Sequence, residues 1–222
     1  MHGTASFVRL AVIASIGDIM KALSLLGVLS LVGCSQLTPR PILQPGSFDG
    51  WHTAPGGSWD WRGDVLIGKS PKSERRHGIL ISDARYSDFD ARVEFRVLSG
   101  DSGFYFRVEE TGGTVAVHGF QSEVDATLET GGLYETGGRA WVVRPDPARM
   151  RAVYRPGEWA SLRVRAIGED VDVWVNGTLT ASLRDDPGRT EGHLGLQLHG
   201  GQDMHVEYRR LELLDLSDSA DR

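Results

Sequence analysis

The stretch Ala91-Arg-Val-Glu-Phe-Arg-Val97 alternates strictly between apolar and charged residues. Successive side chains of an extended chain point to opposite faces, so the four apolar residues would share one face and the three charged residues the other. A period of two residues predicts a β-strand with one buried and one solvent-facing side.

The same alternation recurs in other parts of the chain. The turn signals Ile167-Gly-Glu-Asp170 and Asn176-Gly177 follow two of these stretches. Apart from a turn near residues 147–150, no stretch shows a sustained apolar period of 3.6 residues. Many short strands separated by turns predict an all-β sandwich or jelly roll. The further alternating stretches are Leu162–Ala166, Val171–Val175, Leu194–Leu198 and His205–Leu211.

The composition of the 222-residue chain is that of a soluble globular protein, with 40% hydrophobic and 24% charged residues. The formal net charge of −6 disfavours a nucleic-acid-binding function, for which a basic surface is typical. Cys34 is the single cysteine of the sequence, which excludes an intrachain disulfide and a multi-cysteine metal site.

The N-terminal region has the pattern of a bacterial export signal. From Met20, a lysine precedes a short apolar run that ends in Leu31-Val-Gly-Cys34 and resembles a lipobox. We therefore expect residues 1–33 to be a signal peptide, with Met20 as a plausible true start. Cys34 is expected to be lipidated and to anchor the protein in the bacterial cell envelope. Because Ser35 follows, the resemblance implies the outer membrane in a Gram-negative cell.

The remaining chain divides into three predicted parts. Residues 34–47, which contain three prolines, are predicted to form a lipidated, semi-extended tether. Residues 48–216 are predicted to form one domain, and residues 217–222 a polar tail.

The most informative strand is Phe120-Gln-Ser-Glu-Val-Asp-Ala126. Its alternation puts Gln121, Glu123 and Asp125 on one face. Two carboxylates at i and i+2 lie about 6–7 Å apart along a strand face. In a groove their pKa values would separate, giving the acid and the base that glycoside chemistry requires. The alternative is a solvated strand face without a chemical role.

A series of motifs resembles one known family along the whole predicted domain. The motifs include Phe48-Asp-Gly-Trp51, Gly78-Ile-Leu-Ile-Ser82, Ser102-Gly-Phe-Tyr-Phe-Arg107, Gly119-Phe-Gln-Ser-Glu-Val-Asp125, Thr130-Gly-Gly-Leu-Tyr134 and Gly195-Leu-Gln-Leu-His-Gly200. In this order they resemble the 3-keto-disaccharide hydrolase domain family of secreted bacterial proteins. The resemblance implies a concanavalin A-like jelly roll of two antiparallel sheets, one of which faces substrate. It also implies action on glycosides oxidised at carbon 3, with a sugar 3-dehydrogenase supplying the ketone.

A ketone at carbon 3 acidifies the hydrogen on carbon 2, so a carboxylate can remove it and the carbon-1 substituent can leave by elimination. Glu123 or Asp125 could be the base. Arg107 is a candidate partner for the enolate oxygen, because the alternation puts it on the face of Gly103 and Tyr105. Its alternative role is a structural ion pair. A divalent metal held by Glu123, Asp125 and His199 could also polarise the ketone, although no spacing signature supports this ligand set.

Other residues are candidates for binding the sugar. By the resemblance, Gln197 and His199 lie on the groove. Tyr134 and Arg139 lie on or beside a glycine-rich loop, residues 131–138, that could close over substrate, and Trp141 could line the groove. The remaining histidines, His77 among them, are predicted to be surface residues, apart from His118, which is a minor candidate.

Two other functional classes remain open. Glu123-Val-Asp125 also resembles the acidic strand of laminarinase-type β-glucanases, but those enzymes carry another glutamate where this chain has Thr127. Ordinary double-displacement hydrolysis is therefore disfavoured, and a carbohydrate-binding module without chemistry is the main alternative. A structural envelope lipoprotein is the third.

Overall fold

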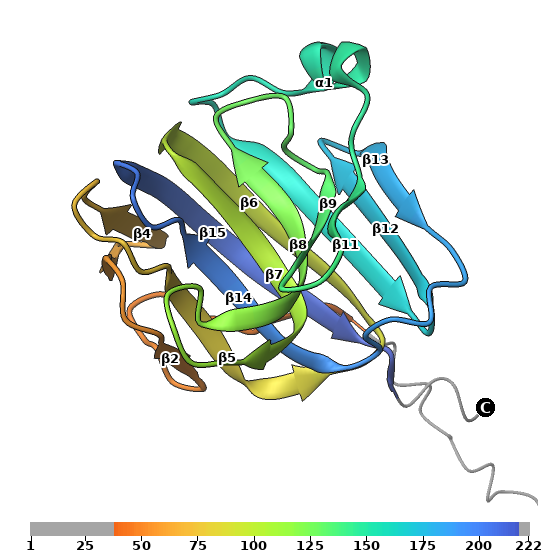
Figure 1. Ribbon diagram of the computed structural model, residues 1–222, viewed down its shortest axis with the longest axis horizontal. Coiled ribbons are helices and arrows are strands. Elements are labelled where there is room, and N and C mark those ends of the chain that lie inside the picture. Colours follow the sequence, from red (N-terminus) through yellow and green to blue (C-terminus); the bar gives the residue numbers. More distant parts are fainter. Residues whose placement is uncertain (1–37, 218–222) are drawn as a thin grey trace, which may run out of the picture. The chain divides into compact units, whose positions relative to one another are not determined.

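The computed structural model describes residues 38–217. The predicted signal peptide, Met20, the lipidation site Cys34 and residues 218–222 lie outside the described residues. No helix in the described part of the chain is long and apolar enough to span a membrane. Within this part the chain is almost entirely β-structure, arranged as two antiparallel sheets, which confirms the predicted jelly-roll sandwich (Figure 1).

One sheet has eight strands, in the order β13-β12-β11-β6-β15-β4-β3, with β1 paired to β15. Its central strand β6 contains the alternating stretch 91–97. The members are β1 (Arg40–Pro41), β3 (Ser58–Arg62), β4 (Val65–Ser70), β6 (Phe89–Ser99), β11 (Ala160–Ile167), β12 (Asp170–Val175), β13 (Thr178–Leu183) and β15 (Met204–Asp215).

The other sheet has seven strands, in the order β10-β9-β8-β7-β14-β5-β2. Strand β8 carries the predicted acidic face and lies between β7 and β9. The members are β2 (Trp51–Thr53), β5 (Gly78–Tyr86), β7 (Asp101–Glu110), β8 (Val117–Asp125), β9 (Leu133–Thr136), β10 (Ala140–Val143) and β14 (Gly192–Leu198).

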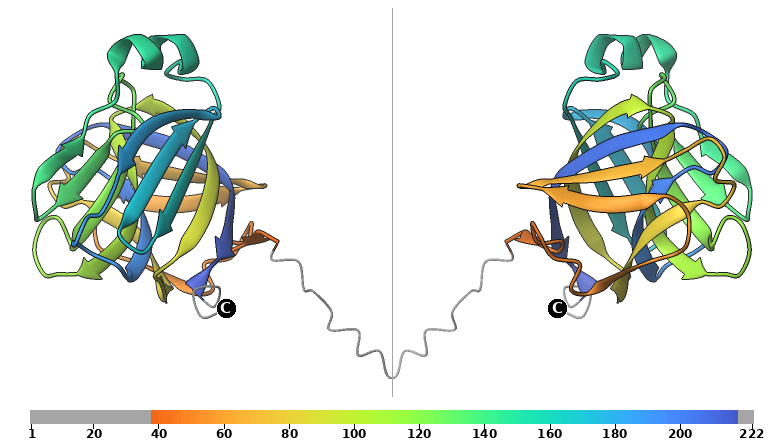
Figure 2. Two further views of the ribbon diagram at one scale, coloured as in Figure 1. Left: turned by 90° about the vertical axis from the view of Figure 1, so that its right-hand side faces the viewer. Right: turned by 90° about the vertical axis from the view of Figure 1, so that its left-hand side faces the viewer.

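The core lies between the two sheets, which pack face to face (Figure 2). The apolar residues of the stretch 91–97 in β6 point inward, and Phe95 is completely buried. From the opposite sheet Phe106 and Phe120 stack with ring centroids 5.5 Å apart. Alternation in both sheets therefore buries one face of each, and the other faces outward.

The single helix of the described residues, α1 (Pro147–Val153), lies at one end of the sandwich (Figure 2). The Asp146 side chain accepts a hydrogen bond from the backbone N–H of Ala148 and caps the helix. Pro147 at the first turn fits there because its missing N–H would have no helical partner. The helix coincides with the turn predicted near residues 147–150.

The sandwich begins before the predicted boundary at residue 48. Pro41 pairs with Glu212 of β15. Leu43 is buried in the core, and the Trp51 indole N–H donates to the carbonyl oxygen of Ile42 at 2.7 Å. Residues 40–43 therefore belong to the folded domain rather than to a free tether. Proline content alone suggested an extended spacer, and the tertiary contacts could not be read from it.

Candidate functional site

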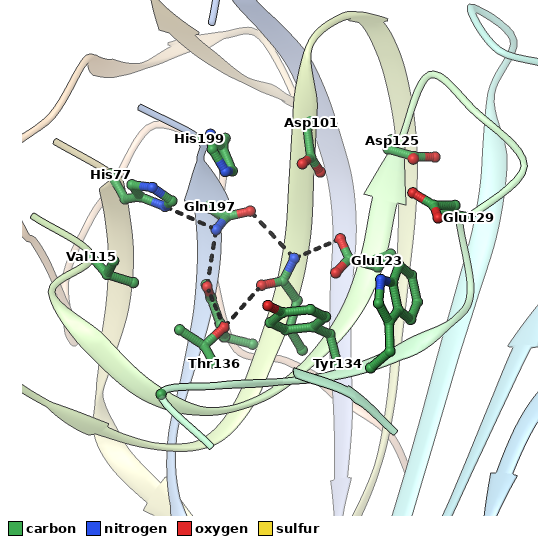
Figure 3. Close-up of a pocket in the computed structure, with 14 residues that line it drawn as sticks. His77, Asp101, Val115, Glu123, Asp125, Glu129, Tyr134, Thr136, Gln197 and His199 are labelled. Carbon is green, nitrogen blue, oxygen red and sulfur yellow. Dashed lines mark hydrogen bonds between the residues drawn. The ribbon is translucent and has the colours of Figure 1, made fainter. Parts of the chain in front are cut away.

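A cavity of about 500 Å³ opens on the outer face of the seven-stranded sheet. This volume lies in the range of small-molecule sites. Strands β7, β8, β9, β10 and β14 contribute most of its wall (Figure 3). The lining residues are His77, Asp101, Tyr105, Val115, Gln121, Glu123, Asp125, Glu129, Tyr134, Thr136, Gly137, Trp141, Gln197 and His199.

Strand β8 provides the floor of the cavity by the alternation its sequence predicts. Phe120 and Val124 point into the core, while Gln121, Glu123 and Asp125 line the cavity. A side chain at Gly103 of the neighbouring strand β7 would collide with Gln121, because a Cβ there would lie 2.5 Å from Gln121 Nε2. The glycine therefore makes the space in which the amide lies beside Glu123.

A chain of hydrogen bonds crosses the floor (Figure 3). Gln121 Nε2 donates to Glu123 Oε2 at 2.7 Å. Gln197 Nε2 donates to the Tyr105 hydroxyl at 2.9 Å, and that hydroxyl lies 3.0 Å from Thr136 Oγ1. These bonds fix the orientation of the polar groups before any ligand binds, as a preorganised site requires.

Glu123 is the carboxylate with the most perturbed environment. It is 8% exposed. Burial raises the pKa of Glu123 well above its usual value, and the negative charges of Asp101 and Asp125 raise it further, while the hydrogen bond from Gln121 opposes them. A carboxyl group with a raised pKa can donate a proton when it is neutral, and its conjugate base is a stronger base than an ordinary carboxylate.

Asp101 completes an acidic group that the sequence analysis did not identify. It pairs in register with Asp125 across β7 and β8. Burial raises the pKa of Asp101 to about 6, with His199 opposing this shift and Asp125 adding to it. Its Oδ1 atom is buried without a hydrogen-bond partner among the described residues. Asp101 begins a strand after Gly100, and only the pairing of β7 with β8 brings it to the cavity.

Asp125 has a different role from Glu123. Its Oδ1 accepts hydrogen bonds from the backbone N–H groups of Thr127 and Thr130 at 2.9 and 3.1 Å, and from the Thr130 hydroxyl at 2.7 Å. The Thr127 hydroxyl donates to Oδ2. These bonds hold the turn that follows β8. Asp125 lines the cavity, but its oxygens are already engaged, so it is less suited to be the base than predicted.

Two histidines lie at the other side of the cavity (Figure 3). The rings of His77 and His199 have centroids 4.2 Å apart. Burial, with a smaller contribution from His199, lowers the pKa of His77 to about 4. Gln197 Nε2 lies 3.2 Å from His77 Nδ1, as expected for a neutral imidazole accepting a bond. The prediction that His77 is a surface residue is wrong, because β5 pairs with β14 and brings it beside Gln197.

An aromatic pair forms one wall. The rings of Tyr134 and Trp141 meet edge to face, with centroids 5.6 Å apart. The glycine-rich segment that carries Tyr134 is not a free loop, since residues 133–136 form β9 and pair with β8. A Cβ at Gly132 would lie 2.7 Å from the Trp141 ring, so one of these glycines serves close packing. Such a wall suits the apolar face of a sugar ring.

Arg107 lies outside the cavity, which contradicts the predicted role at the enolate oxygen. A bulge shifts the register between β7 and β8 after Phe106, and Arg107 has a positive φ of 51°. Its guanidinium donates to the carbonyl oxygens of Ser87, Gly168 and Arg189. Strict alternation predicted the wrong face because it cannot register a bulge. Arg107 is a structural residue that joins three loops.

Arg139 also lies away from the cavity lining. It follows the turn between β9 and β10 and forms ion pairs with Glu135 and Asp186. The predicted contact with substrate is therefore not supported by its position.

The metal set suggested from sequence is not assembled. Among residues 38–217, no group of three or more His, Cys, Asp or Glu side chains is placed to hold a metal ion. Asp125 is engaged in the turn, and His199 Nδ1 lies 2.8 Å from the carbonyl oxygen of Gly200. The residues present do not fit a metal, and no chemical step is assigned to one.

An antiparallel jelly roll with a polar, sugar-sized cavity on one outer face defines a carbohydrate-related domain. The chain belongs to the family of 3-keto-alpha-glucoside-1,2-lyase-like domains, whose model matches residues 41–214. This finding confirms the resemblance stated from the motifs. Comparison with curated proteins gives no match.

Solved structures with similar folds include proteins named for carbohydrate binding or cleavage. The carbohydrate-binding module CBM66 of Bacillus subtilis has a TM-score of 0.59 and 18% identity, covering 75% of this chain and 96% of its own. A Parabacteroides distasonis protein described as a candidate glycosyl hydrolase has a TM-score of 0.58 and 18% identity, covering 78% and 91%. A Bacillus subtilis protein with a galectin-like fold has a TM-score of 0.54 and 11% identity, covering 76% and 90%. At these identities the likeness shows the fold alone.

Proposed function

We propose that this chain is an enzyme that cleaves glycosides or disaccharides oxidised to a ketone at carbon 3. The observation that carries the proposal is Glu123, a buried carboxyl group with a raised pKa, facing a sugar-sized cavity beside Asp101. The family to which the chain belongs is named for this class of substrate.

The proposed reaction begins at carbon 2 of the oxidised sugar. The ionised member of the Glu123–Asp101 pair removes the carbon-2 proton, and the electron pair of that C–H bond forms the enolate of the ketone. The enolate then expels the carbon-1 oxygen, which takes a proton from the protonated member of the pair. Addition of water across the resulting double bond completes a net hydrolysis.

Two coupled carboxyl groups suit this sequence because they exchange the roles of acid and base. Asp101 raises the pKa of Glu123 through its negative charge, so the two carboxyl groups titrate as a coupled pair in which one can hold a proton while the other is ionised. The pair is then ready for both proton transfers. The hydrogen bond from Gln121 to Glu123 fixes the geometry of one member.

Ordinary double-displacement hydrolysis has less support. Where the acidic strand of laminarinase-type enzymes carries a further glutamate, this chain has Thr127, which bonds to Asp125 in the turn after β8. A pathway partner that oxidises carbon 3 would have to supply the substrate, since nothing among the described residues performs that oxidation.

The test is to incubate the domain from residue 38 onward with a 3-keto-glucoside and with its unoxidised parent. Release of the aglycone from the keto form alone supports the proposal. Cleavage of both, or of neither, contradicts it. Addition of a chelator separates metal-dependent from metal-independent turnover, and the account expects the rate to be unchanged.

A carbohydrate-binding module without chemistry is the second candidate. The fold likeness to CBM66 favours it, as does the engagement of Asp125 in a turn. Calorimetric binding of the keto sugar with no product over long incubation would establish this alternative.

We also propose, from the sequence alone, that the protein is lipid-anchored at Cys34 in the bacterial envelope. Labelling cells with a radioactive or clickable palmitate should mark the wild type. A Cys34→Ala variant should remain unlabelled and be found in the soluble fraction. Equal labelling of both would contradict the anchor.

A further inference from the structure

The charges that line the cavity are of one sign. Four carboxylates face it, from Asp101, Glu123, Asp125 and Glu129. No lysine or arginine is among the residues that line the cavity in the described part of the chain. Among the described residues that line the cavity, the titratable nitrogen groups belong to His77 and His199.

Two arginines next to lining residues in the chain or in space, Arg144 and Arg139, are already paired. Arg144 forms an ion pair with Glu129 and lies over the Trp141 ring at 4.1 Å. Arg139 pairs with Glu135 and Asp186. Glu129 is therefore compensated at the rim, whereas Asp101 and Glu123 have no cation bonded to them.

The groups facing the two uncompensated carboxylates give little positive charge. The charges of Asp125 and Glu129 act on both of them, His199 and Gln202 face Asp101, and Gln121 bonds to Glu123. His77 has a pKa of about 4 and is neutral at pH 7. The cavity therefore presents a net negative potential to whatever enters it, offset in part beside Asp101 by His199.

We propose that the site selects sugars by charge: it prefers an amino sugar with a free ammonium group over the neutral sugar, and it rejects uronic acids and phosphorylated sugars. This inference deepens the proposed function and rests on it, because it assumes that the ligand is a sugar.

Hydrogen bonding and Coulomb energy favour this order. An ammonium group brings three donors and no acceptor, which matches the acceptor oxygens of the ionised carboxylates in the lining. A hydroxyl can also donate to a carboxylate but brings no charge. A sugar carboxylate or phosphate would stand beside Asp101 and Glu123 as a like charge, with no arginine or lysine in the lining to bind it.

The selectivity should depend on pH in a defined direction. Binding of an ammonium group favours the ionised carboxylates, so protons are released on binding. As pH falls through about 6, Asp101 becomes neutral and the preference for the amino sugar should diminish. The amino group of such a sugar resembles an α-amino group, with a pKa of about 7.7–8.0, so lowering the pH only increases its protonation and cannot itself weaken the preference.

The experiment is calorimetric titration of the domain at pH 7 and low salt with three methyl glycosides of one configuration: glucoside, 2-amino-2-deoxyglucoside and glucuronide. We expect the amino sugar to bind at least about tenfold tighter than the glucoside and the glucuronide at least about tenfold weaker. The preference should shrink at pH 5 and in high salt.

The Asp101→Asn variant should reduce the ratio of amino-sugar to glucoside affinity several-fold. Asp60→Asn is the matched control, since Asp60 is exposed on β3 of the other sheet. The control should keep the wild-type ratio. Salt and pH dependence of the wild type test the inference independently of any variant.

Equal affinities for the glucoside and the glucuronide, or no preference for the amino sugar, would overturn the inference. If the 3-keto-glucoside is cleaved in that case, the proposed function stands and only the charge selection fails. If no sugar binds and none is cleaved, both fail.

Discussion

The two outer faces of the sandwich carry carboxylates in the same alternating pattern but in opposite electrostatic settings. Glu94 on β6 and Glu123 on β8 both lie on strand faces turned away from the core. Burial acts to raise the pKa of each. For Glu94, hydrogen bonds from Arg209 and Arg210 outweigh burial and lower the pKa below its usual value. For Glu123, no arginine is bonded and the pKa rises.

The eight-stranded face is a ladder of paired charges. Arg163 Nε donates to Asp90 Oδ1 at 2.9 Å, and the Arg163 guanidinium lies 4.5 Å from the Trp174 ring centroid. The guanidinium groups of Arg96 and Arg209 both lie over the Trp159 ring, 5.0 and 4.1 Å from its centroid. The buried carboxylates of this face, Asp90 and Glu207, each pair with an arginine on a neighbouring strand. Such pairing favours stability, while the unpaired carboxylates of the cavity face oppose it, an arrangement that is common at functional sites.

The largest effect is expected at Glu123. The Glu123→Gln variant keeps the size and the hydrogen-bonding capacity of the side chain but cannot transfer the proton. Turnover of a 3-keto-glucoside should fall by at least about 100-fold, the usual range for loss of general acid–base catalysis. Initial rates with matched circular dichroism spectra measure it.

The control for that prediction is Glu207→Gln, the same change at a buried carboxylate on the paired face. Glu207 bonds to Arg96. This variant should keep its turnover within about twofold, and its melting temperature should fall because the ion pair is lost. Equal loss of activity in both variants would remove the distinction between the faces.

The second prediction concerns Asp101 and stability. Its pKa in the folded state is about 6, against 3.8 in a model compound, so ionisation of Asp101 opposes folding. Below about pH 4 Asp101 is neutral in both the folded and the unfolded state, so it does not lower the free energy of unfolding. The destabilisation develops as the pH rises from about 4 and is complete above about 6. Asp101→Asn should therefore be more stable than the wild type at pH 7, by on the order of 2 kcal/mol, after allowance for its partial exposure.

Chemical denaturation at pH 4 and pH 7 tests this. The advantage of the variant should be present at pH 7 and absent at pH 4. A variant that is less stable than the wild type at pH 7 would show that Asp101 has a compensating partner.

The third prediction concerns Asp90, the counterpart on the paired face. Asp90→Asn breaks the pair with Arg163 and should lower the free energy of unfolding by about 1–2 kcal/mol at pH 7. Substrate turnover should be unaffected. The free energy of unfolding at pH 7 should fall in Asp90→Asn and rise in Asp101→Asn, which would show the contrast between the two faces in one measurement. A change in the same direction in both variants would argue against the contrast.

The smallest effect is expected at Arg210, which pairs with Glu94 at the surface. Its side chain is 64% exposed, and exposed ion pairs contribute little. Arg210→Ala should change the free energy of unfolding by less than about 1 kcal/mol. Since Arg209 also bonds to Glu94, the pKa of Glu94 should remain low; titration by carbon-13 NMR checks it, and a value above the ordinary one would make Arg210 the main partner.

The sequence predicts most of the fold and part of the site, for reasons visible in single strands. Period-two alternation identified β6, β8, β11, β12, β14 and β15, whereas β9 was expected to be part of a loop. It put Gln121 and Glu123 on one face, because β8 runs regularly through residues 120–125. The same rule failed at Arg107, where a bulge turns the side chain away. Irregular backbone leaves no trace in an alternating pattern.

Asp101 and His77 show a second limit. Neither lies in a motif, and both reach the cavity through pairing of strands distant in sequence: β7 with β8 for Asp101, and β5 with β14 for His77. The pairing also decides which carboxylates meet arginines. The order of strands cannot be read from alternation, so the sequence could not distinguish the paired acidic face from the unpaired one.

The most direct test of the central claim follows the hydrogen on carbon 2 of the oxidised sugar. A 3-keto-glucoside deuterated at carbon 2 would be turned over in ordinary water by the wild type, and the product analysed by mass spectrometry. The account predicts loss of the deuterium to solvent and a slower rate than with the protonated substrate. Complete retention of deuterium during cleavage would contradict proton abstraction by the carboxylates of this cavity.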